Sequence, residues 1–319
     1  MEKLNKILLS PEVIVILFTQ TLLFVILSIA LYHTLYILSH WVKGSTNTMQ
    51  YSLEKKSYLV SSVVSFSLMV TLLLFTFFTY TINELASLLP GAMCGAGVVG
   101  ANSFGAPAVA IKFFIILLSL LWLKLNHQDT LSKDFKYFRK KLLFFLFLYL
   151  FMLVDLYLTL GFFTNIDTSE PVLCCSCIYT STQESQLPFS LQTLELVTLF
   201  HLSFVLVITA AYFKKSLLLF VFSTVHIVLS YYAITYFFAP YIYELPSHKC
   251  PYCFLQAEYY FVGYFIYASL IMATYYSLSA SLFHFSKSSF KKSIFWHCLF
   301  FLLVSYKFFF YLFTNKIFL

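Results

Sequence analysis

The chain has 319 residues, of which 61% are hydrophobic, 21% aromatic and only 10% charged. About a quarter of the residues of an ordinary soluble domain are charged, so this composition excludes a soluble globular protein and indicates an integral membrane protein. The formal net charge is +7, but no basic stripe is interleaved with exposed aromatic residues. We therefore expect no nucleic-acid partner.

Eight apolar runs follow one another along the chain, each long enough to cross a hydrocarbon core about 30 Å thick. They lie near residues 12–38, 58–81, 106–124, 142–164, 190–213, 216–239, 254–283 and 294–313. The first lacks a small-residue cleavage site and is interpreted as a retained span. We predict an all-α polytopic membrane protein, a bundle of eight transmembrane helices in which residues 1–319 form one integral membrane domain in contact with the lipid bilayer.

The lysines predict the orientation, because cationic loops stay on the cytoplasmic side. Fourteen of the twenty positive residues lie in the loops after spans one, three, five and seven: Lys43, Lys55, Lys56, Lys124, Lys133, Lys136, Arg139, Lys140, Lys141, Lys214, Lys215, Lys287, Lys291 and Lys292. Both termini are therefore expected to be non-cytoplasmic. We predict location in a bacterial inner (cytoplasmic) membrane.

This orientation places six of the seven cysteines in loops on the non-cytoplasmic face. In a bacterium these loops meet the periplasm, where disulfides persist. Cys298, near the cytoplasmic end of span eight, is interpreted as a small packing residue. The first loop contains Met93 and Cys94 and five of the eight glycines of the protein, and is expected to form a flexible re-entrant or surface turn.

The second loop has three sulfurs within four residues, Cys174, Cys175 and Cys177. A relaxed disulfide needs Cα atoms about 5.5 Å apart, whereas sequence neighbours lie about 3.8 Å apart. At least one of the vicinal cysteines should therefore find a partner in another loop. Clustered thiolates also suit monovalent copper or zinc, with Met93 and His248 as additional ligands.

The third loop, HKCPYCFLQAEYY, contains Cys250 and Cys253. If Cys253 starts the helix of span seven, Cys250 lies at its N-terminal boundary. There the helix dipole, Lys249 and His248 all favour a thiolate. A redox pair, a metal site and a structural disulfide all remain open for this CxxC.

The segment CPYCFLQ resembles the CxxCxxQR segment of DsbB-type quinone-linked disulfide oxidases and, more loosely, the membrane CxxC of the vitamin K epoxide reductase family. This resemblance implies that Cys250 and Cys253 are a quinone-proximal pair that takes electrons from a periplasmic thioredoxin-like partner through a second cysteine pair. Gln256 matches the glutamine of the motif. Ala257 stands in place of its arginine and is followed by Glu258, so Gln256 and Glu258 are the candidate quinone contacts.

Polar residues inside the spans are a further pattern, because ionisable groups in hydrocarbon are costly. Asp155, Glu195, His201 and His226 are the main cases, with Lys307 as a counter-charge. Asp155 and His201 could form a proton path, or these residues could make interhelical hydrogen bonds. Haem ligation by His201 and His226 is a further alternative.

Taken together, the sequence favours a membrane thiol/disulfide oxidoreductase that uses Cys250, Cys253, Cys174, Cys175 and Cys177. The alternative is a copper-like soft-metal binding or transfer protein that uses the same sulfurs with Cys94, Met93 and His248 and meets a metallochaperone. A third hypothesis is a structural membrane subunit with disulfide-bonded cysteines. The first two require sulfurs from three loops to converge at one end of the bundle.

Overall fold

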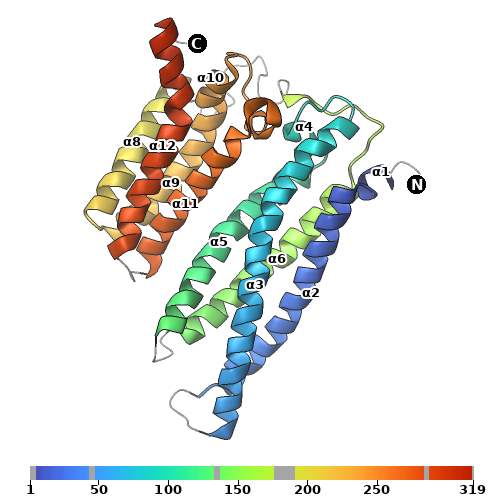
Figure 1. The fold of residues 1–319 in the computed structure, drawn as a ribbon, viewed down its shortest axis with the longest axis vertical. Coiled ribbons are helices and arrows are strands. Elements are labelled where there is room, and N and C mark those ends of the chain that lie inside the picture. The colour runs from blue at the N-terminus through green and yellow to red at the C-terminus, as the bar shows by residue number, and fades with distance from the viewer. Residues whose placement is uncertain (1–4, 43–46, 133–136, 176–190, 284–286, 318–319) are drawn as a thin grey trace. The chain divides into compact units, whose positions relative to one another are not determined.

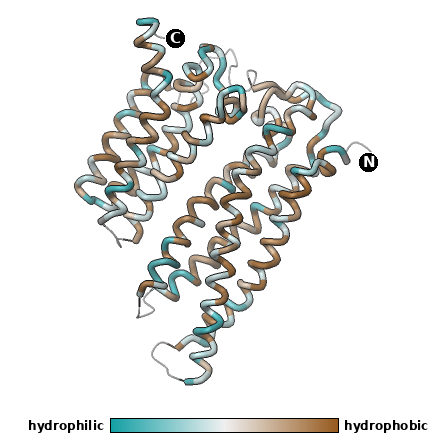
Figure 2. The backbone as a smooth tube through the Cα atoms, viewed as in Figure 1, coloured by the Kyte–Doolittle hydropathy of each residue, from teal (hydrophilic) through white to brown (hydrophobic). Residues whose placement is uncertain are grey.

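A computed structural model describes residues 5–42, 47–132, 137–175, 191–283 and 287–317 (Figure 1). The described chain is all-α, and eight of its helices are long and apolar enough to span a membrane. Hydrophobic residues extend along these helices (Figure 2). The predicted fold class is confirmed.

The described chain divides into two compact units. The first comprises Met1–Thr81 and Val99–Ser169, and the second Ile82–Val98 and Glu170–Leu319. The long helices of the first unit are α2 (Pro11–His40), most of α3 (Thr48–Leu85), α5 (Gly105–Leu131) and α6 (Phe138–Thr164). A short helix, α1 (Asn5–Leu8), precedes them.

The long helices of the second unit are α8 (Thr193–Tyr212), α9 (Ser216–Ala233), α11 (Val262–Phe283) and α12 (Lys287–Asn315). Helix α9 continues through a π-helical turn, η3 (Ile234–Phe238), into α10 (Ala239–Tyr243). Shorter elements are η1 (Ala86–Leu88), α4 (Gly95–Val99) at the boundary of the units, η4 (Cys253–Leu255) and η5 (Ala257–Tyr259).

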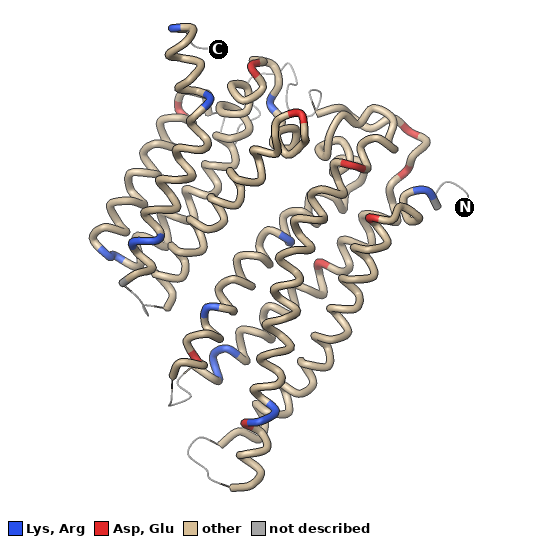
Figure 3. Tube along the Cα trace, in the orientation of Figure 1, with Lys and Arg blue, Asp and Glu red and all other residues tan. Residues whose placement is uncertain are grey.

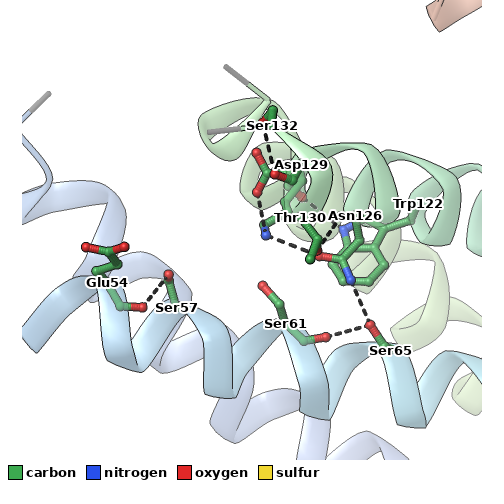
Figure 4. A network of polar contacts seen from close by, with 10 residues as sticks. Glu54, Ser57, Ser61, Ser65, Trp122, Asn126, Asp129, Thr130 and Ser132 are labelled. Atoms are coloured by element: carbon green, nitrogen blue, oxygen red, sulfur yellow. Dashed lines mark hydrogen bonds and ion pairs between the residues drawn. The ribbon is translucent and has the colours of Figure 1, made fainter. Parts of the chain in front are cut away.

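A polar network ties three helices of the first unit together at one end (Figure 4). Lys141 Nζ lies 2.7 Å from Asp129 Oδ2 and donates to Asn126 Oδ1. Asn126 in turn donates to Ser65 Oγ at 3.0 Å, and the Trp122 indole donates to the Lys141 carbonyl oxygen. The end of α5 therefore lies beside the start of α6 and the first half of α3. This arrangement brings basic residues together at that end of the unit (Figure 3).

A buried ion pair lies farther along the first unit. Lys112 Nζ is 2.9 Å from Asp155 Oδ1, and Gln20 Nε2 donates to Asp155 Oδ2 at 2.8 Å. The expectation that Lys307 is the intramembrane counter-charge is therefore wrong. Lys307 instead forms an exposed pair with Glu244 at 3.3 Å. Lys307 lies in the second half of α12, and Glu244 directly follows α10.

Two further expectations from the sequence need correction. Glu195 is exposed and lies in the first turn of α8, where its side chain accepts from the Gln192 amide at 2.9 Å. It is therefore a helix-capping residue and not a buried carboxylate. The seventh span begins at Val262 instead of residue 254, because Tyr260 and Phe261 adopt left-handed backbone conformations (φ 54° and 55°) that no α-helix accommodates.

Candidate metal centre

Four cysteine sulfurs meet inside the second unit. The Sγ atoms of Cys94, Cys175, Cys250 and Cys253 all lie within 4.8 Å of one another, and all four residues are buried. They come from the three connecting segments that follow α3, α6 and α10. The predicted convergence of sulfurs from three loops is confirmed.

The sulfur–sulfur distances fit a shared metal ion. Cys94 and Cys250 Sγ lie 3.5 Å apart, and Cys175 and Cys253 Sγ 3.9 Å apart. A tetrahedral ion about 2.3 Å from each of four thiolates holds the sulfurs about 3.8 Å apart. All four cysteines are free thiols, so the cluster presents four separate ligand atoms.

The first two segments approach each other closely at Gly91. This glycine has a φ of +83°, and a Cβ atom there would overlap the carbonyl oxygen of Val172. The Val172 amide donates to the Pro90 carbonyl oxygen at 2.9 Å. On the other side of Cys94, the Gly95 amide donates to the Asn83 side chain at 2.9 Å. The glycine-rich segment therefore forms a turn that these contacts hold, followed by α4.

The CxxC segment is held by two tyrosines. Tyr243 Oη donates to the Cys250 carbonyl oxygen at 2.5 Å and accepts from the Phe254 amide at 3.1 Å. Tyr267 Oη donates to the Pro251 carbonyl oxygen at 2.9 Å. Because Tyr243 ends α10 and Tyr267 lies in α11, the turn is anchored to helices on both sides.

The predicted helix boundary at Cys250 is wrong. Cys253 begins the short 3₁₀ turn η4, and the long helix starts only at Val262. A long-helix dipole therefore does not act on Cys250. The Tyr252 amide instead points to Cys250 Sγ at 3.4 Å, and such an N–H group also stabilises negative charge on sulfur.

The contacts within and around the cluster shift the pKa values of its thiols in opposite directions. His248 Nε2 lies 3.2 Å from Cys253 Sγ. Hydrogen bonds from the thiols of Cys250, then Cys253 and Cys94, hold the pKa of Cys175 well below its ordinary value. The same interaction with Cys175 is the largest cause that raises the pKa of Cys250 and of Cys253. Within this hydrogen-bonded group the pKa values of Cys175 and Cys94 are lowered, and those of Cys250 and Cys253 are raised.

The other predicted site residues lie around this cluster or away from it. The Met93 side chain is 67% exposed, so it does not join the buried sulfurs, although its carbonyl oxygen accepts from Gln256 Nε2 at 3.3 Å. Glu258 is exposed on η5. Cys174 is half-buried beside Cys175 and is not part of the four-sulfur group. Cys177 lies outside the described residues.

Interhelical hydrogen bonding, one of the two roles predicted for the intramembrane residues, is found for His226, whose Nδ1 lies 2.8 Å from Ser203 Oγ on α8. His201 Nδ1 contacts the Val197 carbonyl oxygen at 2.7 Å. His226 is buried, and its ring lies 5.5 Å from the ring of His297. Sequence reasoning missed His297, although an imidazole within an apolar span was a sufficient signal. It also missed Tyr243, whose role depends on the turn of the chain after α10.

Searches of protein-family models, curated proteins and solved structures find no match to the chain. The fold and the site therefore define its class. It is a polytopic helical membrane protein with a buried cluster of four cysteines.

Proposed function

We propose that the protein binds a thiophilic metal ion through Cys94, Cys175, Cys250 and Cys253. The observation that carries this proposal is the mutual approach of four sulfurs within 4.8 Å. Three separate chain segments supply them, so binding also ties those segments together. Zinc and monovalent copper are the ions whose chemistry suits such a ligand set.

The four sulfurs form a closed site. Every one of them is buried, and a full set of protein ligands without an open position is characteristic of ion holding and not of metal catalysis. The half-buried His248 beside Cys253 supplies a polar contact at the edge of the cluster. Exchange of the ion with a metallochaperone would proceed from that edge.

The electrostatics also suit a cation. Thiolates around an ion leave net negative charge when their number exceeds the charge of the ion. The Tyr252 amide and the His248 imidazole lie within hydrogen-bonding distance of two of the sulfurs. These contacts orient the ligands and offset their charge, as the outer shell of a metal site commonly does.

Cys175, a proposed ligand, and its neighbour Cys174, which lies outside the four-sulfur group, allow a matched test of metal binding. The protein is purified under reducing, anaerobic conditions, and bound zinc and copper are measured by mass spectrometry. We expect one thiolate-bound ion in the wild type, its loss in Cys175→Ser and its retention in Cys174→Ser. Equal metal content in both variants, or no metal after reconstitution of the reduced wild type with zinc or copper, would refute the proposal.

Thiol/disulfide exchange is the second candidate function. It is supported by the approach of Cys250 to Cys94 and of Cys253 to Cys175, which pairs each CxxC cysteine with another loop, and by the resemblance to quinone-linked disulfide oxidases. Oxidation of Cys94 and Cys250 to a disulfide releases two protons and two electrons, which a quinone takes up to form a hydroquinone.

The redox state of the cysteines in cells separates the two candidates. Alkylation at neutral pH, before any acid is added, should find cysteines that metal protects and that are fully reduced once the ion is released, if the site holds an ion. A relay would show cysteines that become oxidised when the quinone pool is oxidised and reduced when respiration is blocked. Cys250→Ser and Cys253→Ser would then trap mixed disulfides with a partner.

A further inference from the structure

Two histidine rings lie next to each other inside the second unit. His226 lies on α9 and His297 on α12, with exposed fractions of 0% and 1%. Their ring centroids are 5.5 Å apart. Neither Nε2 atom has a hydrogen-bond partner among the residues that the structure describes. Buried polar atoms are nearly always hydrogen-bonded, so this pair requires an explanation.

The contacts of His297 determine which nitrogen carries its proton. Its Nδ1 lies 2.9 Å from the carbonyl oxygen of Ser293, one helical turn earlier. A carbonyl oxygen can only accept a hydrogen bond, so Nδ1 must carry the proton. In the neutral imidazole, Nε2 therefore presents a free lone pair.

The contacts of His226 lead to the same tautomer. Ser203 Oγ lies 2.8 Å from the Phe200 carbonyl oxygen and 2.8 Å from His226 Nδ1. The serine has one hydroxyl proton, and a carbonyl oxygen can only accept. Both contacts are hydrogen bonds only if the hydroxyl donates to the Phe200 carbonyl oxygen and accepts from His226. His226 Nδ1 then donates to Ser203 Oγ, and its Nε2 also has a free lone pair.

Two oriented imidazoles with free Nε2 lone pairs are the usual form of a metal-binding histidine pair. Ligating histidines generally donate their other ring N–H to a carbonyl oxygen or a polar side chain, which fixes the tautomer and the ring orientation. Ser293 and Ser203 do this for His297 and His226. An ion bound about 2.0 Å from both Nε2 atoms in a linear arrangement holds the ring centroids about 6 Å apart, so the observed separation of 5.5 Å lies within reach of one shared ion.

The surroundings select the charge and coordination number of the ion. The Phe200 ring stacks on His226 at 5.3 Å, and the Phe300 ring lies 6.1 Å from it. Transfer of charge into such apolar surroundings is costly, and the cost increases with the square of the charge. Zinc also prefers four ligands. A monovalent ion that accepts two nitrogen ligands fits better, and imidazole is a good ligand for copper.

We propose that His226 and His297 together bind one monovalent copper ion through their Nε2 atoms. This site is separate from the four-cysteine cluster and involves different ligand atoms. Each lone pair forms a coordinate bond, and no proton is released because both Nε2 atoms are already unprotonated. The two imidazoles are neutral, so the occupied site carries a single positive charge.

Copper binding to the reduced protein tests the proposal. Apoprotein in detergent is titrated anaerobically with monovalent copper held by a competing chelator, and the number of bound ions is measured. We expect the double variant His226→Gln/His297→Gln to bind one ion fewer than the wild type. His201→Gln, which changes a histidine of α8 in the same unit, should bind the same number as the wild type.

X-ray absorption identifies the ligands of each bound ion. The wild type should show copper–nitrogen scattering that the double variant lacks, and Cys175→Ser should retain it. If the four-cysteine proposal is wrong, copper–sulfur scattering is absent. If the histidine proposal is wrong, copper–nitrogen scattering is absent, so the two outcomes are distinguishable. If a variant unfolds, the spectrum of the copper-saturated wild type still gives a decisive outcome. Absence of copper–nitrogen scattering in the wild type overturns the histidine site.

Discussion

The Sγ atoms of Cys94 and Cys250 lie 3.5 Å apart, although 156 residues separate these cysteines in the chain. Their proximity joins the segment after α3 to the turn before α11, within the second unit. An ion shared by the two sulfurs would close this long loop. Metal binding to the native state alone stabilises it by mass action.

Cys94→Ser should therefore abolish the metal-dependent increase in thermal stability. Added zinc is expected to raise the unfolding midpoint of the reduced wild-type protein in detergent and to leave that of the variant unchanged. Cys298→Ser is the control, because Cys298 lies on α12 outside the cluster. An equal zinc-dependent increase in Cys94→Ser would contradict the assignment of Cys94 as a ligand.

Tyr243→Phe should weaken the site without removing a ligand. The variant loses the hydrogen bonds to the Cys250 carbonyl oxygen and from the Phe254 amide. We expect a loss of about 1–3 kcal/mol of unfolding free energy, since the groups left behind are buried. Loss of an outer contact of a metal site typically lowers metal affinity about 10- to 100-fold.

Competition with a metal chelator measures that affinity change. The control is Tyr260→Phe, because the Tyr260 side chain is 89% exposed in the same loop. An unchanged metal affinity in Tyr243→Phe would show that the turn keeps its geometry without this hydroxyl.

Gly91→Ala should disturb the approach of the first two cysteine-bearing segments. Alanine at a φ of +83° is strained, and its Cβ would meet the Val172 carbonyl oxygen. The displaced segment includes Cys175, so we expect weaker metal binding together with a lower unfolding midpoint. Gly100→Ala changes an exposed glycine without a positive φ and should have little effect. Equal metal affinity in the two variants would argue against a role for the close approach.

Lys112→Met should destabilise the first unit strongly. It leaves Asp155 with a buried charge and no cation, and breaking such a pair costs about 3–5 kcal/mol. The double variant Lys112→Met/Asp155→Leu removes both charges and should recover most of that loss. Lys307→Met disrupts an exposed pair and should cost no more than about 1 kcal/mol. Unfolding midpoints in detergent provide the measurement, and a double variant no more stable than Lys112→Met would contradict this account.

The existence of the eight helices could be predicted because hydropathy is a local property of the chain. Convergence of the cysteine-bearing loops was also predictable, since alternating spans return every second loop to the same end. The helix boundaries and the side-chain pairs inside the bundle could not be predicted in this way. Two left-handed residues, Tyr260 and Phe261, delay α11, and the pairing of Lys112 with Asp155 depends on the relative rotation of α5 and α6. Neither can be read from composition or spacing.

In the candidate site, too, the residue types could be predicted but their contacts could not. Four of the predicted cysteines meet, but spacing alone could not indicate that each CxxC cysteine would approach a sulfur from another loop. Met93 is adjacent to Cys94 in sequence, yet its side chain faces outward and is largely exposed. His297 became a candidate only when its ring was found beside that of His226.

The π-helical turn η3 has a consequence for the evolution of the chain. The Ala239 amide donates to the carbonyl oxygen of Ile234, five residues earlier, so the turn accommodates about one residue more than an α-helical turn. That additional residue rotates everything after it by about 100° relative to a continuous helix, including Tyr243. Deletion of one residue between 234 and 238 would leave α9 intact and swing the tyrosine hydroxyl away from Cys250. Loss of a single codon at this position would therefore remove the hydrogen bonds of Tyr243 to the CxxC turn.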